Sequence, residues 1–202
     1  MVETGTPLGT GKGVVIMVHG RGAGPANILD LVPRLDRPDF TYLAPTAAGR
    51  TWYPHSFMAE TAQNEPWLSS ALRALDRVVS DVVARSIPTE RIVLLGFSQG
   101  ACLMSEYAAG HAARYGGVIA FSGGLVGPPG TTWDDGGSFD GTPVFLGCSE
   151  PDAHVPRARV EESAAVFTRM GASVDMRIYP GMGHTVHDDE IGAARSILDD
   201  IS

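Results

Sequence analysis

The sequence is poor in cysteine and in positive charge. Its two cysteines in 202 residues, Cys102 and Cys148, both sit in apolar stretches, which indicates buried free thiols rather than a disulfide framework. The formal charge is -8, from 15 Lys plus Arg against 23 Asp plus Glu. Such a molecule repels phosphate groups, so we expect it to bind neither nucleic acid nor an anionic lipid surface.

The sequence also contains no pattern that predicts export or membrane insertion. The first residues, "MVETGTPLGTGKG", have neither the basic start nor the apolar core of a signal peptide. No apolar run approaches the ~18 residues that a membrane helix needs, so no membrane span is predicted. We therefore expect a cytoplasmic protein, and a reducing compartment fits the two unpaired cysteines.

What remains is the composition of an ordinary globular protein. The chain is 44% hydrophobic and 19% charged, without a polar or repetitive tract. Its length suits one compact domain. We expect that domain to cover residues 13–202, after an N-terminal segment, residues 1–12, that is free to be flexible.

Short apolar blocks rich in β-branched residues alternate with longer stretches of helical period. This alternation is typical of βα units around a parallel sheet, and the nearly continuous apolar blocks suit strands covered on both faces. The predicted strands are 13–20, 40–45, 91–97, 116–123, 142–148 and 173–181. The predicted helices are 26–35, 66–86, 99–113, 158–170 and 188–201. The sequence thus predicts an α/β fold with a mostly parallel sheet flanked by helices.

The longest predicted helix, 66–86, carries an apolar stripe that we interpret as core packing rather than a partner groove. The stripe comprises Leu68, Leu72, Leu75, Val79, Val82 and Val83. Two long stretches, 46–65 and 124–141, fit neither helical nor strand period. Because such loops in α/β folds gather where ligands bind, we expect them to be functional or mobile and to form the walls of a substrate site.

The residues "GFSQG" at 96–100 match G-x-S-x-G between a predicted strand and a predicted helix. In that setting the pattern predicts a sharp turn that lifts the hydroxyl of Ser98 clear of the sheet as a nucleophile. Glycines at 96 and 100 remove side chains that would collide there. A serine that only caps the helix would give the same five residues, so the prediction depends on finding a base and an acid.

The base is predicted to be His184, in the glycine-flanked loop "YPGMGHTVHDDE" after the last strand, because a serine needs a neighbouring imidazole to take its proton. His187 begins the acidic run that follows, and His111 lies about three turns along the helix, too far to act. The acid that orients the imidazole is predicted to be Asp152 in "SEPDAHVP", which gives the order Ser, acid, His. Glu150 is an alternative that spacing alone leaves open.

The glycine-rich turn "VHGRGAG" is predicted to hold an oxyanion through the backbone N–H of Arg21, together with that of Gln99. His19 is interpreted as shaping this loop. Residues expected to line the substrate pocket are the side chain of Arg21 with Trp52, Tyr53, His55, Phe57 and Trp133.

Taken together, "VHGRGAG", "GFSQGA", "SEPDAHVP" and "YPGMGHTV" make the chain resemble the phospholipase/carboxylesterase branch of the α/β-hydrolases, which includes acyl-protein thioesterases. The resemblance spans about residues 13 to 198. It implies an α/β-hydrolase fold without a large cap domain and a Ser98–Asp152–His184 triad. It also implies a small-molecule ester or thioester substrate, with no metal and no organic cofactor, and it leaves a homodimer open.

Two positions depart from the family pattern. Ala101 stands where a glycine is common, and Arg21 replaces the leucine of thioesterase members. An arginine at the mouth of the site would favour a substrate with a negative group over a long-acyl protein.

Three other interpretations remain at this point. Relatives that resemble dienelactone hydrolase share the sheet and act as lactone hydrolases or lyases, although they often use a different nucleophile. The same scaffold could serve as a non-catalytic small-molecule binding protein. Finally, His184, His187 and Asp188 in "HTVHDD" offer metal ligands, but no further ligand cluster accompanies them.

Overall fold

The computed structural model describes residues 1–133 and 136–201. Residues 134, 135 and 202, which belong to the predicted loop 124–141 and to the end of the predicted domain, lie outside the described residues. The described part forms a seven-stranded sheet in the order β1-β3-β2-β4-β5-β6-β7. Its strands are β1 (Val2–Gly5), β2 (Gly13–Val18), β3 (Phe40–Ala44), β4 (Ile92–Phe97), β5 (Gly117–Phe121), β6 (Pro143–Glu150) and β7 (Ser173–Pro180). β1 pairs antiparallel with β3 and the other pairs are parallel, which confirms the predicted fold class.

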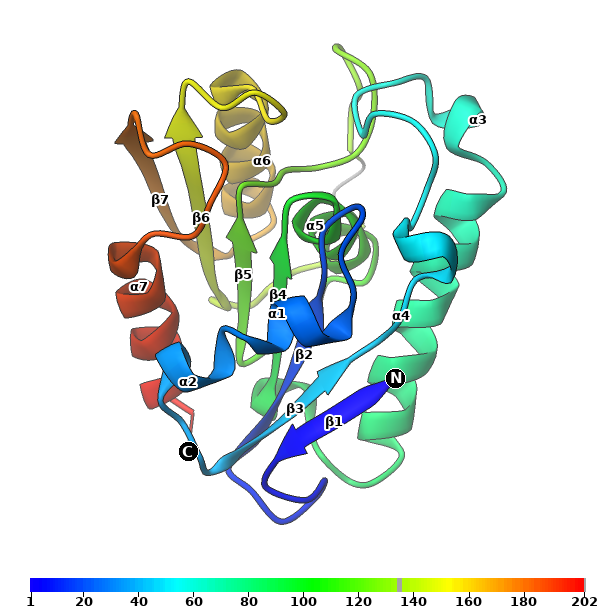
Figure 1. Ribbon diagram of the computed structural model, residues 1–202. Helices are drawn as coiled ribbons and strands as arrows, with labels where there is room; N and C mark the ends of the chain where they lie inside the picture. The colour runs from blue at the N-terminus through cyan, green and yellow to red at the C-terminus, as the bar shows by residue number, and fades with distance from the viewer. Residues whose placement is uncertain (134–135, 202) are drawn as a thin grey trace.

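Helices cover both faces of the sheet. Figure 1 shows α1, α2 and α7 over one face and α4, α5 and α6 over the other. The helices are α1 (Pro25–Leu29), α2 (Val32–Leu35), α3 (Thr61–Asn64), α4 (Trp67–Val83), α5 (Gln99–Gly110), α6 (Arg157–Arg169) and α7 (Asp188–Asp199), with 3-10 turns at η1 (Ala48–Arg50) and η2 (Thr89–Arg91). None of the helices in the described residues has the length and apolar character needed to cross a membrane.

The core is split into two layers by the sheet. Along β2, Val14, Ile16 and Val18 pack in the cluster on the α4–α5–α6 side, whereas Val15 and Met17 pack in the cluster on the α1–α2–α7 side. Successive strand residues point to opposite faces, so a strand covered on both sides must be apolar throughout. Cys102 and Cys148 are both free and buried in this interior, as expected.

Two of the predicted helices need correction. The stretch 26–35 is not one helix, because α1 ends at Leu29 and α2 begins at Val32. Pro33 lies in the first turn of α2, and its missing N–H cannot continue the hydrogen bonds of α1.

The predicted stripe on 66–86 is also altered. In α4, Val83 is 43% exposed and Leu72 is only partly buried. The buried face is instead completed by Ala71 and Val78, which follow the helical period more closely.

The two edge strands differ from the sequence prediction as well. β1 falls within the segment expected to be flexible, and its side chains are exposed. Backbone pairing with β3, from Val2 opposite Ala44 to Gly5 opposite Thr41, holds it in place, and such pairing leaves little trace in side-chain pattern. At the other edge β7 is half exposed rather than buried on both faces. Charged residues such as Asp175 and Arg177 are typical of protected sheet edges.

A sharp turn joins β4 to α5 and carries Ser98. Its φ of 55° and ψ of -124° lie in a region that residues other than glycine rarely adopt. A Cβ at Gly100 would lie 2.1 Å from the carbonyl oxygen of Val18, and one at Gly96 would lie 2.6 Å from that of Gly100. Both glycines are therefore required by close backbone contact, as predicted.

The start of α7 is held by a buried carboxyl group. The backbone N–H of His187 donates to Oε2 of Glu190 at 2.7 Å, which closes a capping box. Oε1 of Glu190 has no hydrogen-bond partner in the described residues. Burial raises the pKa of Glu190 to about 7, although the bond from His187 opposes the rise.

Replacing Gly100 by alanine is expected to lower the free energy of unfolding by about 3 kcal/mol, because the new methyl group meets backbone atoms that cannot rotate away. Gly110→Ala in the same helix is the matched control, since nothing lies within 4 Å of its added Cβ. Urea unfolding of both variants measures the difference. Equal stability of Gly100→Ala and the wild type would contradict this packing.

The folded chain should keep a proton on Glu190 between about pH 4.5 and about pH 7, where the unfolded chain has released it. Raising the pH through this window therefore lowers the free energy of unfolding, by about 3 kcal/mol at most. Glu190→Gln should remove that part of the pH dependence, whereas Glu60→Gln at an exposed site should not. Urea unfolding at about pH 5 and about pH 8 tests this; identical pH slopes for wild type and Glu190→Gln would refute it.

Candidate active site

Ser98, Asp152 and His184 lie beyond the carboxyl ends of the parallel strands, after β4, β6 and β7. These parallel strands end on the same side, at the top of Figure 1, so residues far apart in the chain meet there. Nε2 of His184 is 2.8 Å from Oγ of Ser98, and Nδ1 is 2.8 Å from Oδ2 of Asp152. The alternative acid, Glu150, pairs with Arg157 at 2.8 Å instead.

The carboxyl group of Asp152 is fully buried and well supplied with donors. Oδ1 accepts the backbone N–H groups of His154 at 2.7 Å and Val155 at 3.0 Å. Burial alone would raise the pKa of Asp152, but the hydrogen bonds from His184 and from these amides outweigh it and lower the pKa. The group therefore stays ionised beside the imidazole.

An ionised carboxylate only accepts hydrogen bonds, so it fixes the tautomer of His184. Nδ1 carries the proton, and Nε2 is left to accept from the hydroxyl of Ser98. Two rings hold the imidazole from the sides: the centroid of Phe97 is 5.0 Å away and that of His154 is 4.7 Å away, edge on. Neither ring was singled out from the sequence, although His154 stands inside the quoted "SEPDAHVP".

The two predicted oxyanion donors come from segments next to the serine: Gln99 follows it in the chain, and a Cβ at Gly20, the neighbour of Arg21, would lie 3.3 Å from Cβ of Ser98. The N–H of Gln99 is the first in α5 and has no carbonyl partner within the helix. That of Arg21 has no hydrogen-bond acceptor in the described residues. The positive end of α5 also lies at Gln99, which favours negative charge beside Ser98.

The side chains of the same two residues fasten the loop 46–65. The guanidinium of Arg21 donates to the carbonyl groups of Pro54 and His55, both at 2.6 Å. The amide of Gln99 donates to the carbonyl of Tyr53 at 2.8 Å and accepts from the backbone N–H of Trp52 at 3.0 Å. The guanidinium of Arg21 therefore has a structural contact with this loop, which the sequence did not predict.

His19 supports the oxyanion turn, in line with the sequence interpretation. It is buried, and burial lowers its pKa, against the effect of the bond to Gly20. Nε2 accepts the backbone N–H of Ala47 at 3.2 Å, and the ring packs against Trp52 at 4.9 Å. The indole of Trp52 in turn donates to the carbonyl of His19 at 2.8 Å. Trp52 is therefore packing beneath the site rather than pocket lining.

A cavity of about 160 Å³ opens beside Ser98; we call it the small cavity. Its lining residues are Tyr53, Ser56, Phe57, Ser98, Gln99, Cys102, His154 and Val155. Tyr53 and Phe57 thus agree with the predicted pocket, whereas the side chain of His55 is exposed. Cys102 was predicted only as a buried thiol, and burial raises its pKa to about 12.

Trp133 and the loop that carries it lie elsewhere. Its indole donates to Glu106 at 3.2 Å and its ring packs under the guanidinium of Arg159. That buried guanidinium also donates to the carbonyl groups of Leu125 and Gly127 at 2.8 Å. In its described part the predicted wall 124–141 is held down by these bonds and contributes no lining residue to the small cavity.

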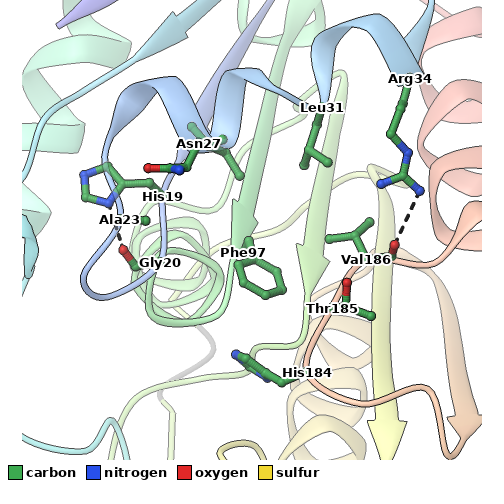
Figure 2. A pocket seen from close by; sticks show the side chains of 11 residues that line it. His19, Gly20, Ala23, Asn27, Leu31, Arg34, Phe97, His184, Thr185 and Val186 are labelled. Atoms are coloured by element: carbon green, nitrogen blue, oxygen red, sulfur yellow. Dashed lines mark hydrogen bonds between the residues drawn. The ribbon is translucent and has the colours of Figure 1, made fainter.

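A second cavity, of about 330 Å³, is lined in part by His184 (Figure 2); we call it the large cavity. Its lining residues are His19, Gly20, Ala23, Asn27, Ile28, Leu31, Arg34, Phe97, His184, Thr185 and Val186. This cavity was not predicted from the sequence. Its walls combine apolar and polar residues from three distant segments, and only the fold brings these segments together.

The alternative metal site does not form in the described residues. His184 contacts Ser98 and Asp152, His187 accepts the backbone N–H of Asp189 at 3.1 Å, and Asp188 pairs with Arg34 at 2.8 Å. Within residues 1–133 and 136–201 no three His, Cys, Asp or Glu side chains gather in a way that could hold a metal ion.

Comparison with known proteins places the chain in a family. The model of the phospholipase/carboxylesterase family matches residues 6–202. A solved phospholipase/carboxylesterase from Dyadobacter fermentans is 43% identical, with a TM-score of 0.92 over 98% of this chain and 95% of that one. Acyl-protein thioesterase 1 of Eremothecium gossypii is 29% identical over 93% of this chain and 89% of its own length.

A carboxylesterase from Bacillus cereus shares the fold at lower identity. It is 19% identical, with a TM-score of 0.79 over 100% of this chain and 93% of that one. The family match covers nearly the whole described chain, and its members hydrolyse ester bonds. The chain therefore belongs to the phospholipase/carboxylesterase family of hydrolases.

Proposed function

We propose that this enzyme is a serine hydrolase that cleaves carboxylic esters, and thioesters by the same route, through an acyl-enzyme on Ser98. His184 is the general base and acid, and Asp152 orients it. The observation that carries the proposal is the unbroken line of contacts Ser98–His184–Asp152, with 2.8 Å at each step. Such a line is the arrangement that turns a weak serine nucleophile into a reactive one.

In the first half of the reaction, Oγ of Ser98 attacks the carbonyl carbon while Nε2 of His184 takes the hydroxyl proton. The carbonyl oxygen becomes an oxyanion and is held by the N–H groups of Arg21 and Gln99. When the tetrahedral species collapses, Nε2 returns the proton to the leaving oxygen or sulfur. The carbon–leaving-group bond breaks, and the acyl group stays on Ser98.

In the second half, a water molecule takes the place of the leaving group. Nε2 of His184 removes a proton from it as it attacks the acyl carbon, and the same two amides hold the new oxyanion. Collapse returns the proton to Oγ of Ser98 and releases the carboxylic acid. The charge on the imidazole is balanced in both halves by the buried, ionised Asp152.

The backbone N–H groups of Arg21 and Gln99 need no rearrangement at the moment of reaction, which makes them effective oxyanion donors. One preorganised oxyanion donor of this kind is worth about a hundred- to thousandfold in rate. The clamp formed by the side chains of Arg21 and Gln99 on residues 52–55 supports this, because it fixes both donors relative to Ser98.

Ser98→Ala is expected to abolish labelling by a fluorophosphonate probe and to lower kcat/KM for para-nitrophenyl acetate by at least about a thousandfold. Ser70→Ala, at an exposed serine of α4, is the matched control and should behave as the wild type. The measurement is steady-state ester hydrolysis together with probe labelling. Undiminished hydrolysis by Ser98→Ala would overturn the proposal.

Asp152→Asn should lower kcat by about ten-thousandfold at neutral pH, since the amide favours the wrong tautomer of His184. Glu150→Gln, at the competing acid, should retain activity within about twofold because its side chain contacts Arg157 rather than His184. Circular dichroism establishes that both variants are folded before their kcat values are compared. The reverse ranking of the two variants would assign the acid to Glu150.

A further inference from the structure

Two cavities adjoin the reacting groups, and they share no lining residue. His184 lines the large cavity with Thr185 and Val186, as Figure 2 shows. Ser98 and Gln99 line the small cavity. The proton donor and the nucleophile therefore open onto separate spaces.

The direction of proton transfer indicates which part of the substrate lies in each cavity. In the reaction proposed above, the leaving oxygen or sulfur must receive its proton from Nε2 of His184, so the leaving group lies on the side of that ring. The acyl carbon is bonded to Oγ of Ser98 and its oxygen points to the amide of Gln99, so the acyl chain extends away from His184.

We propose that the large cavity is the leaving-group subsite and the small cavity is the acyl subsite. The enzyme then selects esters or thioesters that combine a short acyl group with a bulky, apolar alcohol or thiol. This inference rests on the proposed function, because it uses the roles of Ser98 and His184.

The acyl limit follows from the volume of the small cavity. A cavity of about 150 Å³ accepts a benzene molecule, so 160 Å³ holds an acyl chain of about six carbon atoms. The walls of the small cavity are rigid. Tyr53 and Phe57 are 1% and 7% exposed, and the loop between them is fastened by Arg21 and Gln99. Further methylene groups of a long acyl chain would remain in water.

The large cavity has about twice that volume and lies within the range of small-molecule sites. Its apolar surface comes from Ile28, Leu31, Phe97 and Val186. Arg34 stands at its far edge in Figure 2, but its guanidinium already donates to the carbonyl of Val186 at 3.3 Å and to Asp188 at 2.8 Å. Because this cation is paired, the cavity suits an apolar leaving group rather than an anionic one.

The test uses two series of esters with the wild-type enzyme. In para-nitrophenyl esters, kcat/KM should rise up to about fourfold per methylene, the equivalent of about 0.8 kcal/mol, and stop rising beyond about hexanoate. In acetate esters of matched acidity, para-butylphenyl acetate should exceed phenyl acetate by about tenfold or more. A continued rise to dodecanoate, or no gain from the butyl group, would overturn the inference.

Two variants separate the subsites. Leu31→Ala should lower kcat/KM for para-butylphenyl acetate about tenfold and leave the acyl-length profile unchanged. It should also leave the deacylation rate constant unchanged, since the acyl-enzyme no longer holds the leaving group. Phe57→Leu, with Phe57→Ala as the larger change, should move the acyl optimum to longer chains and alter deacylation. Stopped-flow bursts give the two rate constants separately.

The outcomes distinguish this inference from the proposed function. If hydrolysis depends on Ser98 but Leu31→Ala shifts the acyl-length profile, or Phe57→Leu shifts only the leaving-group preference, the subsites are assigned wrongly and the triad stands. If hydrolysis survives Ser98→Ala, the proposed function itself fails.

Discussion

The close approach of α5 to the end of β2 is the constraint on which the site depends. Gly100 lies so near the carbonyl oxygens of Val18 and His19 that a side chain has no room. This contact brings the turn with Ser98 against the turn with Arg21, from which we propose that the oxyanion is held. The backbone of Ser98 has an unfavourable φ. Close packing on both sides of the turn holds it in this conformation between strand and helix.

The second constraint is the fastening of residues 46–65 over the site. This stretch has little regular structure of its own, yet backbone groups of residues 52–55 are bound by the side chains of Arg21 and Gln99. The two residues whose amides are proposed to hold the oxyanion therefore also shape the wall of the small cavity. A change in either side chain would alter catalysis and acyl selection together, since both depend on the same few hydrogen bonds.

The sequence predicted the centre of the site better than its walls. Ser98, Asp152 and His184 could be found because each follows a strand, and parallel strands bring such positions to one edge. The guanidinium of Arg21 could not be placed, since its partners are carbonyl groups more than thirty residues away that carry no side-chain signal. Trp133 was expected to line the pocket, but its ring contacts Glu106 and Arg159. For an aromatic residue in a long loop, the sequence alone does not distinguish such packing from pocket lining. The large cavity went unnoticed because Ile28, Phe97 and Val186 have the pattern of ordinary core residues.

In the proposed mechanism Ser98 carries the acyl group between two chemical steps. Rapid quenching during turnover of para-butylphenyl acetate, followed by peptide mapping by mass spectrometry, tests it most directly. We expect an acetyl group on the peptide that contains Ser98, formed in the first turnover and lost as product appears. An acetyl group on another residue, or full turnover with no acylated peptide at any time, would contradict it.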